Sequence, residues 1–142
     1  MISQQYIDPL QVVYEYLVMQ TPQGVASVLY PLTATRVYID SDPKDLVLAA
    51  CIVIRQPGGT DLASAAVNNP VIQLDCYGGS DNPQAARAVT LAATYQLHRA
   101  RAVETATGVL LSAIREGGGS VIPTPEGVRP FIPVYFRVLT RP

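Results

Sequence analysis

The sequence has few charged residues and few of the side chains on which enzymes depend. Charged residues make up 15% of its 142 residues, against about 25% in an average soluble protein. It contains one histidine, one lysine, two cysteines and no tryptophan. Ten lysine and arginine residues nearly balance eleven aspartate and glutamate residues, which gives a formal net charge of -1. No global positive field is therefore available to attract nucleic acid or an anionic membrane, and we expect no direct nucleic-acid recognition.

Long apolar runs and secretion signals are also missing. No run reaches the roughly 18 residues that a membrane-spanning helix needs, and the first residues, MISQQYIDPL, lack the basic segment that begins a secretion signal. We therefore expect a chain that is made and kept in a cytoplasm, with no membrane partner. Cys51 and Cys76 lack the paired spacing of a zinc site and are too few for a secreted disulfide framework, so we expect buried, reduced thiols.

The stretch VIQLDCYGGSDNPQAARA, from Val71 to Ala88, has the outward form of an active site, because it combines a cysteine, a glycine pair and the start of a helix. A nucleophilic Cys76 would need a histidine to take its proton, and the single His98 falls near the far end of the following helix. The glycine pair matches neither GxGxxG nor GxxxxGK, so a plain turn between a strand and a helix explains it. We expect no catalytic residue in this stretch.

Metal sites are equally poorly supported. A lone histidine without neighbouring cysteines, histidines or clustered carboxylates cannot build a site. Asp40, Asp42 and Asp45 lack the EF-hand spacing and have Lys44 among them, so a polar turn is the better interpretation. The sequence therefore predicts no metal, no cofactor and no enzymatic activity.

Two helices are signalled by the same device, a capping side chain followed by proline. Asp8 before Pro9 predicts a helix from about Asp8 to Met19, with apolar residues on two of its faces. Asn82 before Pro83 predicts the second helix, which presents a core stripe of small and apolar residues. That stripe consists of Ala86, Val89, Ala93, Leu97 and Ala100.

Four segments have the pattern of strands. Asp45–Arg55 is apolar at both parities, which indicates a strand buried on both sides, and Val71–Tyr77 alternates and is expected to lie antiparallel to it. The last two are expected at Val109–Glu116 and Phe131–Leu139. Because Pro133 cannot donate a hydrogen bond, we expect the final strand to be an edge or to pair on one side only.

The intervening segment from Thr21 to Pro43 contains several prolines and is expected to be irregular, with one or two short strands at VASVLY and TRVYID. The whole pattern predicts a single domain over residues 1–142 of the α+β class. We expect a mainly antiparallel sheet of four or five strands with two helices packed on one face, in the order α-β-β-α-β-β.

The sequence has more apolar surface than one sheet and two helices use. Hydrophobic residues make up 49% of the chain, one strand is apolar on both faces and the first helix has two apolar stripes. A neighbouring copy of the chain could cover these second surfaces. The alternative is that residues 21–45 cover them. Nine of the ten basic residues are arginine, which suits interfaces, although a GC-rich genome explains that preference equally well.

Two loops are the candidates for subunit contacts, because they are long and are accompanied by arginines. The first follows Arg55 and contains Gly58, Gly59 and Asp61. The second runs from about Gly117 to Arg129 and contains Gly118. Arg55, Arg115 and Arg129 are the candidate partners across the subunit boundary.

The order of these features resembles the tail terminator, or tail completion, proteins of long-tailed bacteriophages. The resemblance covers most of the chain. It lies in the N-terminal amphipathic helix, in NPVIQLDCYGGSDNPQAARAVTLAATYQL as strand, turn and alanine-rich helix, and in GVRPFIPVYFRVLTRP as the closing strand. The 56–70 loop and the proline-rich segment from Val121 to Pro133 depart from a minimal member of that family.

The resemblance implies a structural subunit of the virion, located at the head-proximal end of the tail. Such subunits form a homo-oligomeric ring, usually a hexamer, which caps the tail tube, ends its polymerisation and docks to the head-tail connector. The implied partners are the tail tube protein and the connector protein. Two alternatives remain: another head-tail joining protein, such as an adaptor or a stopper, and a small cytoplasmic enzyme that uses Cys76 or Cys51.

Overall fold

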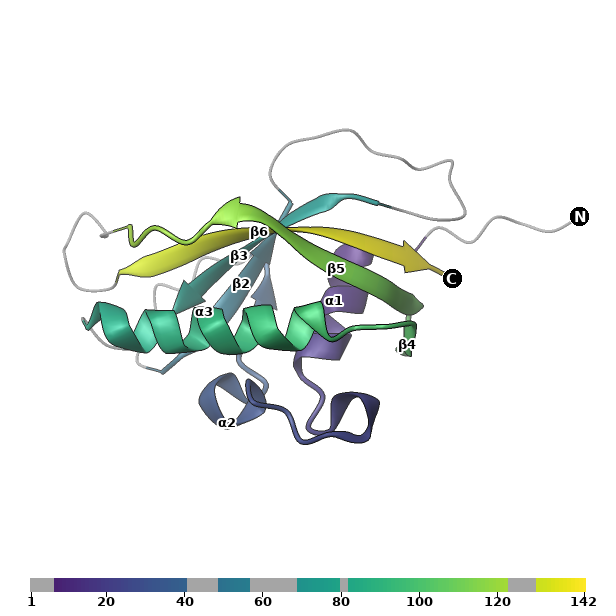
Figure 1. Ribbon diagram of the computed structural model, residues 1–142, viewed down its shortest axis with the longest axis horizontal. Coiled ribbons are helices and arrows are strands. Elements are labelled where there is room, and N and C mark those ends of the chain that lie inside the picture. Colours follow the sequence, from purple (N-terminus) through teal and green to yellow (C-terminus); the bar gives the residue numbers. More distant parts are fainter. Residues whose placement is uncertain (1–6, 41–48, 57–68, 80–81, 123–129) are drawn as a thin grey trace, which may run out of the picture.

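The computed structural model describes residues 7–40, 49–56, 69–79, 82–122 and 130–142. It contains a six-stranded mixed sheet whose strands follow the order β1-β2-β3-β6-β5-β4. The β1–β2 pair is parallel, and every other pair is antiparallel. Figure 1 shows α3 lying along one side of the curled sheet with α1 beside it. In chain order the elements are α1 (Pro9–Leu17), the 3-10 turn η1 (Pro22–Gly24), α2 (Tyr30–Thr33), β1 (Val37–Ile39), β2 (Cys51–Arg55), β3 (Val71–Tyr77), α3 (Pro83–His98), β4 (Val103–Glu104), β5 (Val109–Gly118) and β6 (Phe131–Arg141).

The α+β class is confirmed, but the predicted number and order of elements need correction. The sheet has six strands, whereas the sequence predicts four or five. A short third helix also precedes β1. β1 does fall within TRVYID, whereas β4, with two residues, was not anticipated. Elements this short give no periodicity that a sequence pattern could reveal.

Both long helices begin at the predicted caps. The Asp8 side chain accepts a hydrogen bond from the Leu10 N–H at 3.0 Å, and the Asn82 side chain accepts one from the Gln84 N–H at 3.0 Å. A proline follows each cap at the first helical position, where its missing N–H costs nothing. The predicted core stripe of α3, from Ala86 to Ala100, is buried in full.

The VASVLY segment forms no strand, because a serine turns the chain there. The Ser27 hydroxyl oxygen accepts hydrogen bonds from the N–H groups of Leu29 and Tyr30 at 3.1 and 2.9 Å, which favours a helical turn over an extended conformation. The same hydroxyl donates to the side-chain oxygen of Gln96 on α3. The Gln96 amide nitrogen in turn donates to the Tyr16 carbonyl at 3.3 Å, so a buried polar bridge joins this segment, α3 and α1.

The prediction of a one-sided final strand is wrong. β6 is an interior strand that pairs with β3 on one side and with β5 on the other. The Pro133 carbonyl accepts a hydrogen bond from the Gly119 N–H at 2.9 Å. A residue's nitrogen and carbonyl point to the same side of a strand, so the missing N–H of Pro133 falls where β5 ends at Gly118. The proline therefore removes a hydrogen bond only at the end of the ladder.

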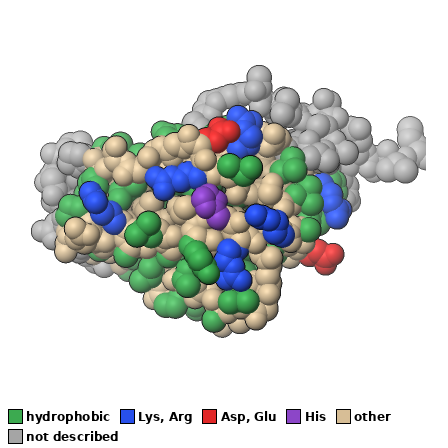
Figure 2. Space-filling view, viewed as in Figure 1, with side chains coloured by type: hydrophobic (Ala, Val, Ile, Leu, Met, Phe, Trp, Pro, Cys, Tyr) green, Lys and Arg blue, Asp and Glu red, His purple; other side chains and the backbone are tan. Residues whose placement is uncertain are grey.

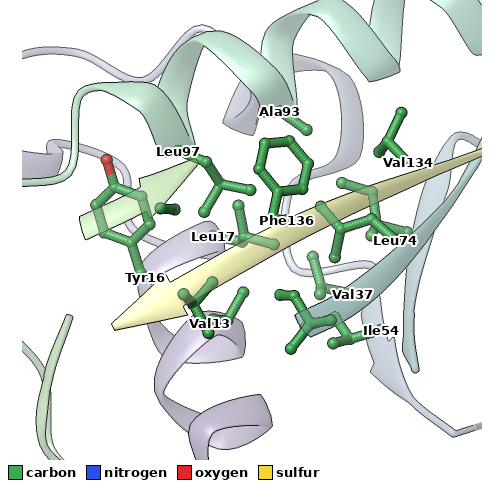
Figure 3. Packing of buried hydrophobic residues seen from close by; sticks show 14 of the residues in the cluster. Val13, Tyr16, Leu17, Val37, Ile54, Leu74, Ala93, Leu97, Val134 and Phe136 are labelled. Atoms are coloured by element: carbon green, nitrogen blue, oxygen red, sulfur yellow. The ribbon is translucent and has the colours of Figure 1, made fainter. Parts of the chain in front are cut away.

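The main core lies between the helices and one face of the sheet. Figure 3 shows Phe136 of β6 surrounded by Leu17 of α1, Leu74 of β3 and Leu97 of α3. All four side chains have no exposed surface. Since residues of α1 and α3 share this one cluster, the two helices pack on the same face, as predicted.

The apolar surfaces that the sequence left over are covered within one chain. On α1, the second stripe includes Val12 and Tyr16, which are 0% and 1% exposed. On the opposite face of the sheet, Cys51 and Val53 of β2 are fully buried and form a second cluster with Tyr77. A neighbouring copy is therefore not required to cover either element, and the alternative explanation gains support because Tyr38 of β1 packs against this cluster.

Candidate assembly surface

The structure places the predicted interface residues apart. Arg55 lies on β2 and Arg115 on β5, with β3 and β6 between them in the sheet. Arg55 already has a partner in its own chain, because its Nε lies 2.8 Å from Oδ2 of the buried Asp75. Gln73 donates to the other carboxylate oxygen of Asp75 at 2.7 Å. The contact between β2 and β3 thus explains Arg55 without a second subunit.

Two residues of the second predicted loop region, Arg115 and Gly118, contribute to the structure of their own chain. The Arg115 guanidinium donates to the Gly118 carbonyl at 3.3 Å. Gly118 has φ of 88°, and a Cβ atom there would lie 2.3 Å from the Pro133 carbonyl oxygen, so only glycine fits this end of β5. The remaining predicted residues, Gly58, Gly59, Asp61 and Arg129, lie outside the described residues, and their subunit contacts stay a prediction.

Neither cysteine has the surroundings of a nucleophile. Both cysteine side chains are fully buried, and neither forms a disulfide bond. Burial raises the pKa of Cys76 to about 12, which keeps it protonated at neutral pH. Cys76 lies opposite Ile132 on β6, while His98 lies against Phe136. The two positions are four residues apart along β6, or about 13 Å of strand, so His98 cannot take a proton directly from Cys76.

The described part of the chain shows no metal-binding cluster and one small hollow. In that part, no three histidine, cysteine or acidic side chains are grouped closely enough to hold a metal ion. One shallow hollow lies between α3 and the segment around Ser27, with Tyr16, Val28, Tyr95 and Arg99 among its lining residues. It holds little more than a water molecule. Within the same residues, no helix is both long and apolar enough to cross a membrane.

The most distinctive surface is the outer side of α3. Arg87, Leu91, Tyr95 and Arg99 recur at every fourth position, on the side of the helix away from the core. Leu91 is 67% exposed and Tyr95 is 53% exposed. The Arg99 guanidinium lies 5.5 Å from the centre of the Tyr95 ring, at cation-π distance. We call these four residues the α3 face.

The α3 face has basic and apolar side chains but no acidic ones. From Asn82 to Val103 the sequence contains three arginines and no aspartate or glutamate. Figure 2 shows this side of the molecule, where basic side chains are spread over α3 and the neighbouring strand among hydrophobic ones, and acidic side chains are few. The apolar part continues across the hollow to Val28, which is 47% exposed.

Sequence reasoning described only the inner stripe of α3 and missed this outer one. A signal was present, because a leucine and a tyrosine four positions apart on the polar side of an amphipathic helix are out of place in a monomer. The acid-free run around them was a second signal.

A second surface lies at the turn between β4 and β5 and carries acidic residues. The Glu15 carboxylate accepts hydrogen bonds from the N–H and the hydroxyl of Thr107 at 2.9 and 2.7 Å, which ties α1 to this turn. Asp8 lies two helical turns before Glu15, and Glu104 belongs to β4, directly before the turn. Asp8 and Glu104 are exposed. We call Asp8, Glu15 and Glu104 the turn face.

Comparison with known proteins gives a structural match and no sequence match. No family model matches the chain, and no curated protein matches it. Among solved structures, a chain from the virion of a native gene transfer agent particle superposes with a TM-score of 0.64 at 18% sequence identity. The match covers 94% of this chain and 95% of that chain. The two chains therefore share a fold over nearly their whole lengths.

Proposed function

We propose that this chain is a structural protein of a phage-like virion, and specifically a tail terminator. The observation that carries the proposal is the shared fold with a chain of a gene transfer agent virion, with 94% of one chain and 95% of the other in the match. The sequence features that resemble tail terminators support the finer assignment.

In this proposal six copies form a ring at the head-proximal end of the tail. The ring covers the surface on which the next tail tube subunit would assemble, and so it ends growth of the tube. Its other side docks to the head-tail connector. The work is done by binding alone, since a cap needs only to occupy a surface more stably than the next tube subunit would.

The described residues suit such a role better than an enzymatic one. Both thiols are buried, and burial raises the pKa of Cys76 to about 12, so the alternative of a thiol enzyme loses its nucleophile. The α3 face, in contrast, combines arginine with exposed tyrosine and leucine, and arginine and tyrosine are enriched in protein interfaces. These features favour a protein whose function depends on contacts with other proteins.

The test has two parts. Light scattering and negative-stain microscopy of the purified protein should show a closed ring, and a monomer at all concentrations would contradict the proposal. In cells that produce the particle, deletion of this gene should give tail tubes of abnormal, variable length, and a plasmid copy should restore the normal length.

The deletion also distinguishes a tail terminator from another head-tail joining protein. If the chain is an adaptor or a stopper, its loss should leave tails of normal length that fail to join filled heads. That result would retain a virion protein and reject the tail terminator.

A further inference from the structure

We propose that neighbouring copies in the ring join head to tail, with the α3 face of one copy docked on the turn face of the next. This inference rests on the proposed function, because it assigns the contact that closes the ring. It differs from the loop contacts predicted from the sequence.

The α3 face requires a partner with acidic and apolar groups. Arg87 and Arg99 stand at the two ends of the stripe, with Leu91 and Tyr95 between them. The two central side chains are 67% and 53% exposed. A phosphate backbone would pair with the arginines but leave this apolar centre in water, whereas a protein surface covers both. The face therefore fits a protein better than a nucleic acid.

The chain itself supplies the complementary charge. The segment from Asn82 to Val103 has three basic and no acidic residues, so the rest of the chain has seven basic and eleven acidic residues. A nearly neutral chain that concentrates positive charge on one helix must carry an excess of negative charge elsewhere. A second copy is thus an electrostatically matched partner for the α3 face.

The turn face carries three of the six acidic residues in the described part of the chain. Burial would raise the pKa of Glu15, but hydrogen bonds from Thr107 and Gln11 lower it below its usual value, so the carboxylate is charged at neutral pH. Glu104 is exposed and takes part in no described ion pair. The turn face thus presents fixed negative charge to a partner.

The proposed contact is heterologous, because it joins two different faces head to tail. One copy uses its α3 face toward one neighbour and its turn face toward the other, and such a contact closes into a ring when the rotation per copy is suitable. A two-fold dimer that paired one α3 face with another would bring their arginines together, and these would repel each other.

The experiment reverses each face in turn. One variant carries Arg87→Glu and Arg99→Glu, and the other carries Glu15→Arg and Glu104→Arg. In either variant alone, every contact in the ring joins like charges. We expect the protein concentration at half-assembly, measured by light scattering, to rise about tenfold or more in each.

An equimolar mixture of the two variants is the decisive sample. In an alternating ring, a reversed α3 face meets a reversed turn face, and a native α3 face meets a native turn face. Every contact is then complementary, so the mixture should recover ring formation to within about threefold of the wild-type concentration. Alternation also requires an even number of copies, as in a hexamer.

Two controls separate folding and net charge from docking. Because Glu15 holds Thr107, Glu104→Arg alone serves as a second reversal of the turn face that leaves this contact in place. Thr35→Glu makes the chain more acidic at an exposed position before β1, at the opposite edge of the sheet from β4, and it should assemble normally. Circular dichroism should show that each variant is folded.

The outcomes distinguish this inference from the proposed function. A wild-type protein that stays monomeric overturns both. A wild-type ring together with normal assembly of the α3-face variant overturns the inference and leaves the ring intact. Failure of the mixture to recover would show that the two faces do not meet. Binding of a short DNA duplex that the α3-face variant alone loses, with its assembly unchanged, would assign the face to nucleic acid instead.

Discussion

α1 and α3 begin with the same sequence device and yet have different surroundings. α1 contacts β1, β2, β6 and β5 of the sheet and also α3, and six of its nine residues are buried. α3 buries one side and leaves Leu91 and Tyr95 in solvent. Local signals therefore decide where a helix starts, whereas its place in the fold decides how much of it remains available to a partner.

The sharpest way to break this comparison is to shorten one leucine on each helix. Leu17 of α1 is fully buried and Leu91 of α3 is 67% exposed. We expect Leu17→Ala to lower the free energy of unfolding by about 2–5 kcal/mol, because it leaves a cavity in the core. Leu91→Ala should change it by no more than about 0.5 kcal/mol. Urea denaturation measures both, and equal losses would show that Leu91 is packed.

A second contrast lies between a tyrosine on each helix. Burial raises the pKa of Tyr16 from 10.0 to about 12, and its hydroxyl donates to the Gln96 carbonyl. In the unfolded chain the phenol ionises first, so its contribution to stability is complete below pH 10 and is lost as the pH rises to 12. The loss should be about 3 kcal/mol at most.

Urea denaturation across that pH range isolates this effect. Tyr16→Phe should flatten the decline of stability between pH 10 and 12, whereas the matched Tyr95→Phe should retain the wild-type decline. Cys76, whose pKa burial also raises to about 12, contributes equally to all three proteins and cancels in the comparison. Identical slopes for wild type and Tyr16→Phe would remove Tyr16 from the explanation.

The smallest expected effect concerns the N-cap, which α1 and α3 have in common. Asp8→Ala and Asn82→Ala each remove a side-chain acceptor from a first-turn N–H. Each substitution should lower the free energy of unfolding by about 1 kcal/mol, because the two caps make the same kind of hydrogen bond. Thermal unfolding of the two variants should give similar losses. A loss of stability several times larger for Asp8→Ala than for Asn82→Ala would mean that Asp8 has a further structural partner.

The parts of the fold that could be predicted depend on neighbours in the sequence. The caps at Asp8 and Asn82 and the buried stripe of α3 each involve residues within a few turns of one another. Between distant segments prediction failed, because Ser27 reaches Gln96 and Arg55 reaches Asp75 only in the folded chain. The direction of the missing N–H of Pro133, which decides whether β6 can lie inside the sheet, is also set by the register with β5.

The candidate surface was missed for a related reason. The sequence predicts that apolar surface on α1 and on β2 stays unburied in a single copy of the chain. Both are covered by their own chain. Leu91 and Tyr95 are exposed instead, since α3 lies on the outside of the core with this side turned to solvent. Which of several amphipathic elements ends up outermost is a property of the packing and not of any single segment.

The amide of Gln96 has a consequence for related sequences. Its oxygen accepts a hydrogen bond from the Ser27 hydroxyl, and its nitrogen donates one to the Tyr16 carbonyl. A side chain at this position therefore needs both an acceptor and a donor at the distance of the glutamine amide from the helix backbone. Glutamate lacks the donor, asparagine is one methylene too short, and leucine or methionine offers neither. An apolar residue would leave the buried Ser27 hydroxyl without its acceptor, at a cost of about 1–3 kcal/mol, and glutamate would lose a hydrogen bond that joins α3 to α1. Homologues that keep this arrangement of three segments should therefore keep glutamine here, even where the rest of the helix has diverged.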